Sequence, residues 1–140
     1  MISFFYESIE IKLNEERLTS WLVKAIYLEE KKEGEINFIF CKDDYLIEIN
    51  KEFLNHNTYT DIISFDNSLG NELHGDIYIS YDRVEDNSVI YDVKVLEELK
   101  RVMIHGILHF CGYKDKTEEE KKLMRQKEDE MLKMFHVEHL

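Results

Sequence analysis

The chain has 140 residues, 44% of them hydrophobic, which suits one ordinary domain with a real core, and residues 1–140 are predicted to form that single domain. Its formal net charge of −12 argues against a broad basic surface for nucleic acid, although residues 91–140 carry a net charge of only −1. The sequence contains no run of about 18 apolar residues, no signal-peptide pattern and no disulfide framework, so a reducing cytoplasm is expected and a membrane location is not.

The first predicted elements are a strand, a helix and a second strand. Residues 2–8 are strand-like because alternate side chains are hydrophobic. Asn14 can cap a helix, since acidic residues follow it and hydrophobic residues then recur at the helical period. Gly34 is predicted to lie in the turn after this helix. Residues 36–41 are predicted to form the second strand.

The middle of the chain predicts one helix and two more strands. Asp43 or Asp44 is expected to cap the helix. Residues 60–65 and 75–80 have the composition of strands. The segment between them is long for a tight hairpin, so an extended loop is expected there.

Two helices are predicted in the last third of the chain. The first begins near Asp92 and ends at Gly112, a residue suited to the position after a helix. The second covers residues 116–132, and Thr117 with Glu120 forms a capping box at its start. The order of elements indicates an α+β fold, with a small mixed four-stranded sheet, helices packed on it and a metal site on a helix of the C-terminal half.

The stretch HGILHFCGYKD (105–115) carries the clearest chemical signal. His105 and His109 are four residues apart, so a helix presents both imidazoles on one face. The chain can turn back at Gly112, which allows Asp115 to supply a third ligand. Three ligands leave one position open, as in catalytic zinc sites.

Other residues could replace Asp115 as the third ligand. Cys111 is expected to point away from the ligand face as a small buried residue, and the two histidines near the C-terminus are expected to be inert. The rival ligands are His56, His74 and the cluster Glu118–Glu120, and the two inert histidines are His136 and His139.

The same stretch resembles the signature of the YbeY family of bacterial metal-dependent endoribonucleases, His-Gly-x-Leu-His-x-x-Gly-Tyr-Asp-His. LNHNTYTDIISF and HGDIYIS are similar to further motifs of that family, and the last helix, with Met124 and Glu128, is similar to its tail. The resemblance covers roughly residues 45–135. Two features depart from it: Asp115 stands where the family usually has a third histidine, and no basic residue precedes Thr60 and Asp61.

The resemblance implies a cytoplasmic, single-strand-specific endoribonuclease that acts in ribosomal RNA maturation and ribosome quality control. Its partners would be RNA and the ribosome or ribosome-associated proteins. One divalent ion, expected to be zinc, would be held by His105, His109 and Asp115, and the water bound to that metal would be the catalytic centre.

Five further residues have candidate roles beside these ligands. Arg83 and Arg101 could take over the substrate contacts of the missing basic residue, although surface salt bridges are the plainer interpretation of both. Asp61, Ser64 and Asp76 match motif positions of the family, but strand-end capping and turn hydrogen bonds explain them equally well.

Two other classes of function remain open. A zinc peptidase would carry a glutamate directly after the first histidine as its general base, and Gly106 occupies that place. Phosphodiester cleavage needs such a base less, because a metal can activate its own water. The second alternative is a non-catalytic, ribosome-associated binding module in which metal only stabilises the fold.

Overall fold

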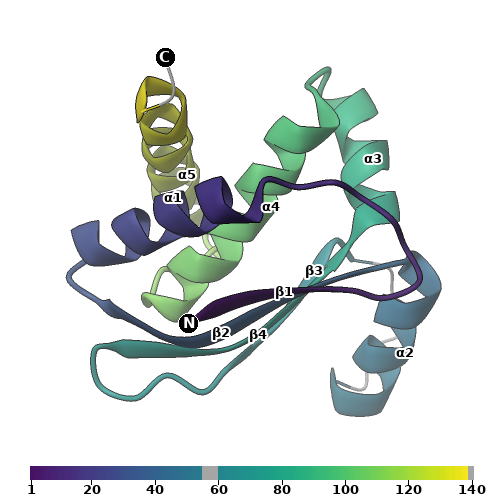
Figure 1. Cartoon of the computed structure of the whole chain (residues 1–140), viewed down its shortest axis with the longest axis horizontal. Coiled ribbons are helices and arrows are strands. Elements are labelled where there is room, and N and C mark those ends of the chain that lie inside the picture. Colours follow the sequence, from purple (N-terminus) through teal and green to yellow (C-terminus); the bar gives the residue numbers. More distant parts are fainter. Residues whose placement is uncertain (55–59, 139–140) are drawn as a thin grey trace.

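The computed structural model describes residues 1–54 and 60–138, which form one four-stranded sheet with helices on both faces (Figure 1). The strands are β1 (Ile2–Tyr6), β2 (Lys32–Cys41), β3 (Ile62–Asp66) and β4 (Glu72–Ser80). The helices are α1 (Glu15–Leu28), α2 (Asp43–Leu54), α3 (Tyr81–Ile90), α4 (Val95–Phe110) and α5 (Glu118–Glu138). Within these ranges, no helix combines the length and the apolar character needed to cross a bilayer.

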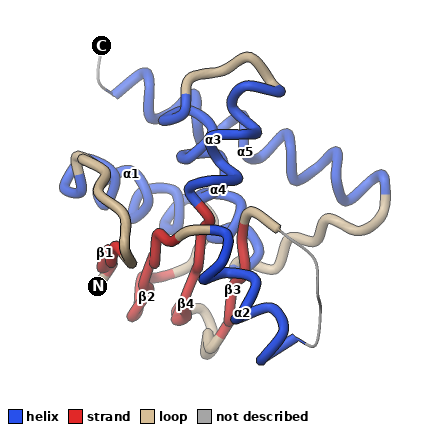
Figure 2. Tube along the Cα trace, turned by 90° about the vertical axis from the view of Figure 1, so that its right-hand side faces the viewer, coloured by secondary structure: helices blue, strands red, loops and turns tan. Residues whose placement is uncertain are grey.

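The sheet is mixed, as predicted, and runs in the order β1-β2-β4-β3. β1, β2 and β4 are parallel to one another, whereas β3 is antiparallel to β4. Figure 2 shows α1 and α4 above the sheet and α2 on its other side. The α+β class and the four-stranded mixed sheet predicted from the sequence are therefore confirmed.

The main core lies between the sheet and the layer of α1, α4 and α5. In β4 every second residue is buried toward this layer, as a strand with one packed face requires. Trp21 of α1 is completely buried, and its Nε1 donates to the backbone oxygen of Met131, 2.8 Å away, which docks α5 onto α1. A smaller cluster of Cys41, Leu46 and Ile63 packs α2 on the opposite face.

Gly106 allows α4 to lie close to the sheet, as the sequence suggested. A Cβ atom at this position would be 3.0 Å from Ile77 Cδ1 and 3.1 Å from Ile62 Cδ1, tighter than ordinary packing. Because α4 packs closely on β3 and β4 at Gly106, the position of the adjacent His105 relative to these strands is fixed. The packing of α4 thus positions the first candidate ligand.

Three predictions for individual elements were wrong. α3 was not predicted, because only Val84 and Ser88 are buried along it and its hydrophobic period is correspondingly weak. Gly34 lies inside β2 rather than in a turn, at a place where a side chain would collide with the His74 ring. The connection between β3 and β4 is only 67–71, since β4 already begins at Glu72.

Two of the three predicted helix N-terminal caps agree with the structure. The Asn14 side chain accepts a hydrogen bond from Arg17 N at 3.1 Å. Glu120 N donates to Thr117 Oγ1 at 3.1 Å and Thr117 N donates to Glu120 Oε1 at 2.9 Å, which completes the capping box. Asp43 is instead the first residue of α2, and its own N–H donates to Asp82 Oδ2 at 2.9 Å.

Candidate metal centre

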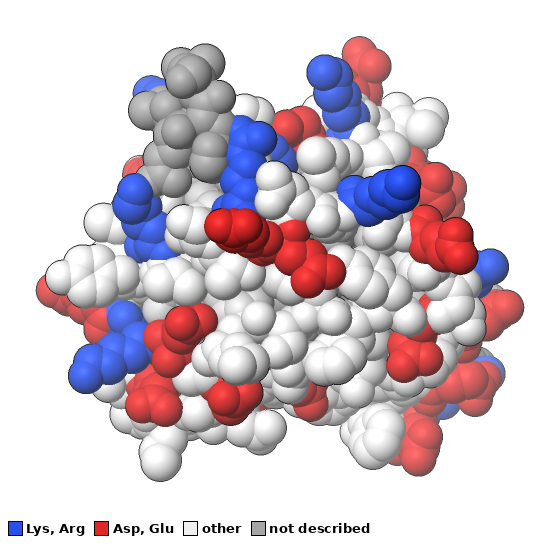
Figure 3. Space-filling model, in the orientation of Figure 1, with Lys and Arg blue, Asp and Glu red and all other residues white. Residues whose placement is uncertain are grey.

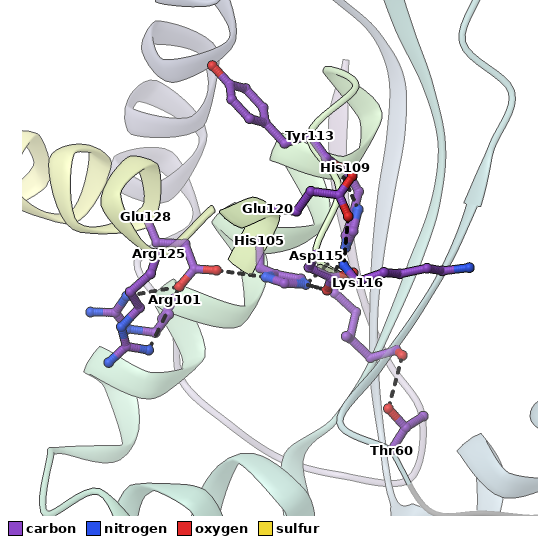
Figure 4. Close-up of polar contacts among 11 residues, drawn as sticks. Thr60, Arg101, His105, His109, Tyr113, Asp115, Lys116, Glu120, Arg125 and Glu128 are labelled. Atoms are coloured by element: carbon purple, nitrogen blue, oxygen red, sulfur yellow. Dashed lines mark hydrogen bonds and ion pairs between the residues drawn. The ribbon is translucent and has the colours of Figure 1, made fainter. Parts of the chain in front are cut away.

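His105, His109 and Asp115 come together at the end of α4 (Figure 4). The two Nε2 atoms are 3.0 Å apart, as expected for histidines one helical turn apart. Asp115 Oδ2 lies 3.1 Å from His105 Nε2 and 3.2 Å from His109 Nε2. The three side chains that the sequence singled out therefore present three ligand atoms to one point.

Asp115 reaches this point because the chain reverses after α4. The helix ends at Phe110, and Gly112 has a φ of +106°, a conformation that residues with a Cβ rarely adopt. Gly112 N donates to His109 O at 3.0 Å and Tyr113 N donates to Leu108 O at 3.0 Å. These bonds fold the segment back against the helix, as the glycine at this position predicted.

The hydrogen bonds at the far side of each ring fix which nitrogen faces the centre. His105 Nδ1 is 2.7 Å from Glu128 Oε2, and His109 Nδ1 is 2.9 Å from Tyr113 O. Since a carboxylate and a carbonyl only accept, both Nδ1 atoms carry a proton, and in the neutral rings both Nε2 atoms therefore keep a lone pair. Two lone pairs and a carboxylate oxygen facing one another are stabilised by a positive charge between them.

The spacing of the three ligand atoms suits a small divalent ion. A tetrahedral ion with metal–nitrogen distances of about 2.0–2.1 Å has ligand atoms about 3.3 Å apart. The observed separations are 3.0–3.2 Å. The donor set of two imidazoles and one carboxylate is also one that zinc accepts, with one position left open. The described residues thus form a group that could hold a metal ion.

The electrostatics of the group favour a cation as well. Burial lowers the pKa of His105, but the hydrogen bond and charge of Glu128, followed by the charges of Asp115 and Asp61, raise it by more. The sum of these effects raises the pKa of His105. A site that stabilises an imidazolium also stabilises a metal cation at the same place.

Glu128 is the residue that the sequence reasoning missed. It lies on α5, is only 5% exposed, and also accepts a hydrogen bond from Arg101 Nη1 at 2.9 Å. Figure 4 shows Arg101 beside Glu128. Arg101 Nη2 also contacts Asp129 Oδ1 at 2.7 Å, so its guanidinium is held between two acids. A signal was present in the sequence: Glu128 stands four residues after Met124 in the buried stripe of α5. An acid within such a stripe has a partner.

The other candidate residues lie apart from the three ligand atoms. Arg83 Nε contacts Asp43 Oδ2 at 3.0 Å and so joins α3 to α2. Asp76 accepts from Asn37 Nδ2 at 2.9 Å on the sheet face opposite α4. Ser64 lies in β3 opposite Ile77.

Two of the rival third ligands, His74 and Glu120, are engaged elsewhere. His74 Nδ1 accepts from Glu35 N at 3.0 Å, and its Nε2 is 2.8 Å from Glu72 Oε1. Glu120 caps α5. His136, expected to be inert, pairs with Glu97 at 3.0 Å. His56 and His139 lie outside the described residues.

A groove opens beside the candidate ligands, between α4 and α5. We call it the α4–α5 groove; it has a volume of about 340 Å³, and His105 and Asp115 line one end of it. Its other walls are formed by α3, α4, α5 and the segment before β3. Asp61 is among these residues, and burial raises the pKa of its carboxyl. Further lining residues are Ile62, Asn87, Tyr91, Glu98, Arg101, Val102, Lys121, Met124, Arg125 and Glu128.

Comparisons with known proteins agree on one family. The family described as "Endoribonuclease YbeY" matches residues 2–136 of the chain. Proteins named endoribonuclease YbeY are 59% identical in Flavobacterium psychrophilum, over 98% of both chains, and 59% identical in Flavobacterium johnsoniae, over 99% of both. The solution structure of TM1509 from Thermotoga maritima is similar with a TM-score of 0.71 at 25% identity, covering 99% of this chain and 91% of that one. The chain therefore belongs to the YbeY family.

Proposed function

We propose that this protein is a metal-dependent, single-strand-specific endoribonuclease that acts in ribosomal RNA maturation and ribosome quality control in the cytoplasm. The observation that carries the proposal is the convergence of His105, His109 and Asp115 at one end of a groove, in a chain 59% identical to relatives named endoribonuclease YbeY. Its partners would be RNA and the ribosome or ribosome-associated proteins. The expected metal is zinc, because imidazole nitrogens and a carboxylate oxygen form the donor set.

Each residue of the centre has a distinct task in this proposal. When bound, a divalent ion would polarise a phosphoryl oxygen and make a water molecule more acidic. His105, His109 and Asp115 would hold it, while Glu128 and the Tyr113 carbonyl keep the histidine protons on Nδ1. Outer hydrogen bonds of this kind orient metal-binding imidazoles.

The glycine after the first histidine disfavours the peptidase alternative. A side chain at position 106 would point toward Ile77 and Ile62 in the sheet, because a Cβ would already be within 3.2 Å of both. A glutamate there would be directed into the core and away from the three ligand atoms. The place where zinc peptidases carry their general base thus faces the wrong side of α4.

The test combines substrates, a chelator and a matched pair of variants. Purified protein is incubated with single-stranded RNA, structured RNA and a casein panel, each with and without a chelator, and metal content is measured. We expect cleavage of single-stranded RNA only, lost on chelation and in His105→Ala. Glu130→Gln, an exposed change on α5 remote from the ligands, should behave as the parent. RNA cleavage that survives both chelation and His105→Ala would refute the metal-dependent mechanism.

The same experiment decides between the alternatives. Chelator-sensitive cleavage of casein would support the peptidase. Ribosome association that persists on chelation, with no cleavage of any RNA and a lower melting temperature, would support a binding module held together by metal.

A further inference from the structure

The α4–α5 groove has the dimensions of a site for one small ligand. Pockets that bind small molecules and cofactors commonly have volumes of about 300–1,000 Å³. At about 340 Å³ the groove is at the small end of this range, so it suits a single nucleotide unit rather than a length of strand. Because His105 and Asp115 line the groove, a nucleotide bound in it would lie next to a phosphate bound at the metal centre.

The walls of the groove suit a planar base. Val102 and Met124 line it with side chains that are 4% and 2% exposed, and Ile62 adds further apolar surface. Tyr91, which is 58% exposed, presents an aromatic ring to the same space. Bases of single-stranded nucleic acids stack on such rings without regard to sequence.

One acidic side chain in the groove accepts no hydrogen bond from the described residues. Glu98, on the first turn of α4, is only 6% exposed, yet within residues 1–54 and 60–138 its carboxylate accepts no hydrogen bond and forms no ion pair. Burial, and then the charge of Asp61, raise the pKa of Glu98, while the charges of Arg101 and Arg125 lower it. The carboxylate can therefore accept a hydrogen bond from a ligand that brings a donor into the groove.

Basic side chains stand near this acid. The side chains of Lys121 and Arg125 are 57% and 61% exposed and line the groove from α5. With Arg101, three basic side chains line the groove. Four acidic ones also line it: Asp61, Glu98, Asp115 and Glu128. The groove is therefore nearly neutral in a chain of net charge −12. Such side chains can contact phosphates, which position a strand without reading its bases.

We infer that the α4–α5 groove binds the nucleotide adjacent to the scissile phosphate and that Glu98 makes it select cytosine over uracil. The two pyrimidines have the same size, but cytosine offers an amino group at N4 where uracil offers the acceptor O4. A carboxylate only accepts, so it pairs with the first and repels the second. This inference rests on the proposed function, since it assigns a substrate preference to the same site.

The test compares the binding of cytidine and uridine monophosphates to the full chain. Binding is followed by NMR through the methyl signals of Met124 and Val102, which locate the ligand in the groove. Cytidine monophosphate should bind about tenfold more tightly than uridine monophosphate. Glu98→Gln should abolish or reverse this ratio, because an amide can donate to O4. Glu130→Gln removes a charge of the same kind outside the groove and should leave the ratio unchanged.

A second variant separates stacking from selection. Tyr91→Ala should weaken the binding of both nucleotides about tenfold and leave their ratio unchanged, since stacking is tolerant of the base. Tyr91 is exposed, so this variant keeps the measurement decisive even if Glu98→Gln does not fold.

Two results would overturn the inference. One is equal binding of both nucleotides by the parent protein. The other is the absence of any response of the Met124 and Val102 signals at nucleotide concentrations in the millimolar range. If single-stranded RNA is still cut in a chelator-sensitive manner, the proposed function survives and only the base-selecting groove is refuted. If neither cleavage nor nucleotide binding is found, both proposals fall.

Discussion

At the scale of single residues, Asp115 gives the candidate centre a negative charge that a third histidine would not bring. Its Oδ2 lies 3.1 Å and 3.2 Å from the two Nε2 atoms. We expect Asp115→Ala to bind metal more weakly, because only two ligands remain. Asp115→His should retain the metal, and Asp115→Asn should fall between them, since an amide oxygen coordinates without charge. Competition with a chromogenic chelator measures the three affinities. Parent-like affinity in Asp115→Ala would show that the third ligand lies elsewhere.

Glu128 supports the same centre from a second helix. Replacing it by glutamine keeps the shape but removes the charge that faces His105 Nδ1. We expect Glu128→Gln to lower metal affinity by about 10–100-fold, as is usual for outer partners of metal-binding histidines. The control is Asp129→Asn, which loosens Arg101 but leaves the contact between Glu128 and His105 intact. Its affinity should change less. Equal effects of the two variants would assign the role to Arg101 instead.

The two thiols should be inert at neutral pH. Burial, and then nearby acidic groups, raise the pKa of Cys41 and of Cys111 from 9.0 to about 12. Because the thiolate is the reactive form, a thiol reagent at pH 8 should label the folded chain about a thousandfold more slowly than the urea-unfolded chain. Between pH 9 and pH 12 the unfolded chain loses these protons first, so the free energy of unfolding should fall as the pH rises. Rapid labelling of the folded protein would contradict this prediction.

At the scale of elements, the contact of α4 with the sheet is the feature that holds the ligands in place. We expect Gly106→Val to lower the free energy of unfolding by about 1–3 kcal/mol, because its side chain would overpack against Ile77 and Ile62. Urea denaturation measures the change. Leu96→Val, at an exposed position of the same helix, introduces valine without overpacking and should cost less. If both cost the same, helix propensity rather than packing would explain the effect.

Helix α5 serves the centre from a distance in sequence. It is docked on α1 through Trp21 and on α4 through Glu97 and His136. On the N-terminal side of both contacts it places Glu128 against His105, 23 residues away along the chain. The metal centre therefore depends on the packing of two helices and not on α4 alone.

At the scale of the whole molecule, charge limits how RNA can approach. On the face drawn in Figure 3, the described basic side chains are separated by acidic and uncharged ones and form no continuous stripe. With a net charge of −12, binding must rely on a few local cations. The surroundings of the α4–α5 groove supply several of them.

We therefore predict a shallow salt dependence of RNA binding. Lys116→Ala should weaken binding and flatten the plot of log affinity against log salt by about 0.7 if one phosphate contact is lost. Arg83→Ala and Arg101→Ala test the two arginines proposed as substrate contacts in the same way, and Lys51→Ala on α2 is the control. Unchanged affinity and slope in the first three variants would place the RNA on another surface.

The sequence by itself determined the parts of this protein that depend on local geometry. Helical spacing brings His105 and His109 onto one face, and Gly112 allows the reversal that returns Asp115 to them. The caps at Asn14 and Thr117 are likewise set by neighbouring residues. For the same reason the α+β class and the four strands could be predicted, since each follows from a pattern within a short segment.

Only the tertiary structure decided the features that join distant segments. Glu128 faces His105, and Glu98 lines a groove with Tyr91 and Met124, because α3, α4 and α5 pack together. The need for a glycine at position 34 in β2 comes from His74 of a neighbouring strand, whose ring leaves no room for a side chain. The weak hydrophobic period of α3 concealed a helix that its contacts with α4 hold in place. Such contacts depend on the packing free energy of the whole chain, which no local pattern in the sequence records.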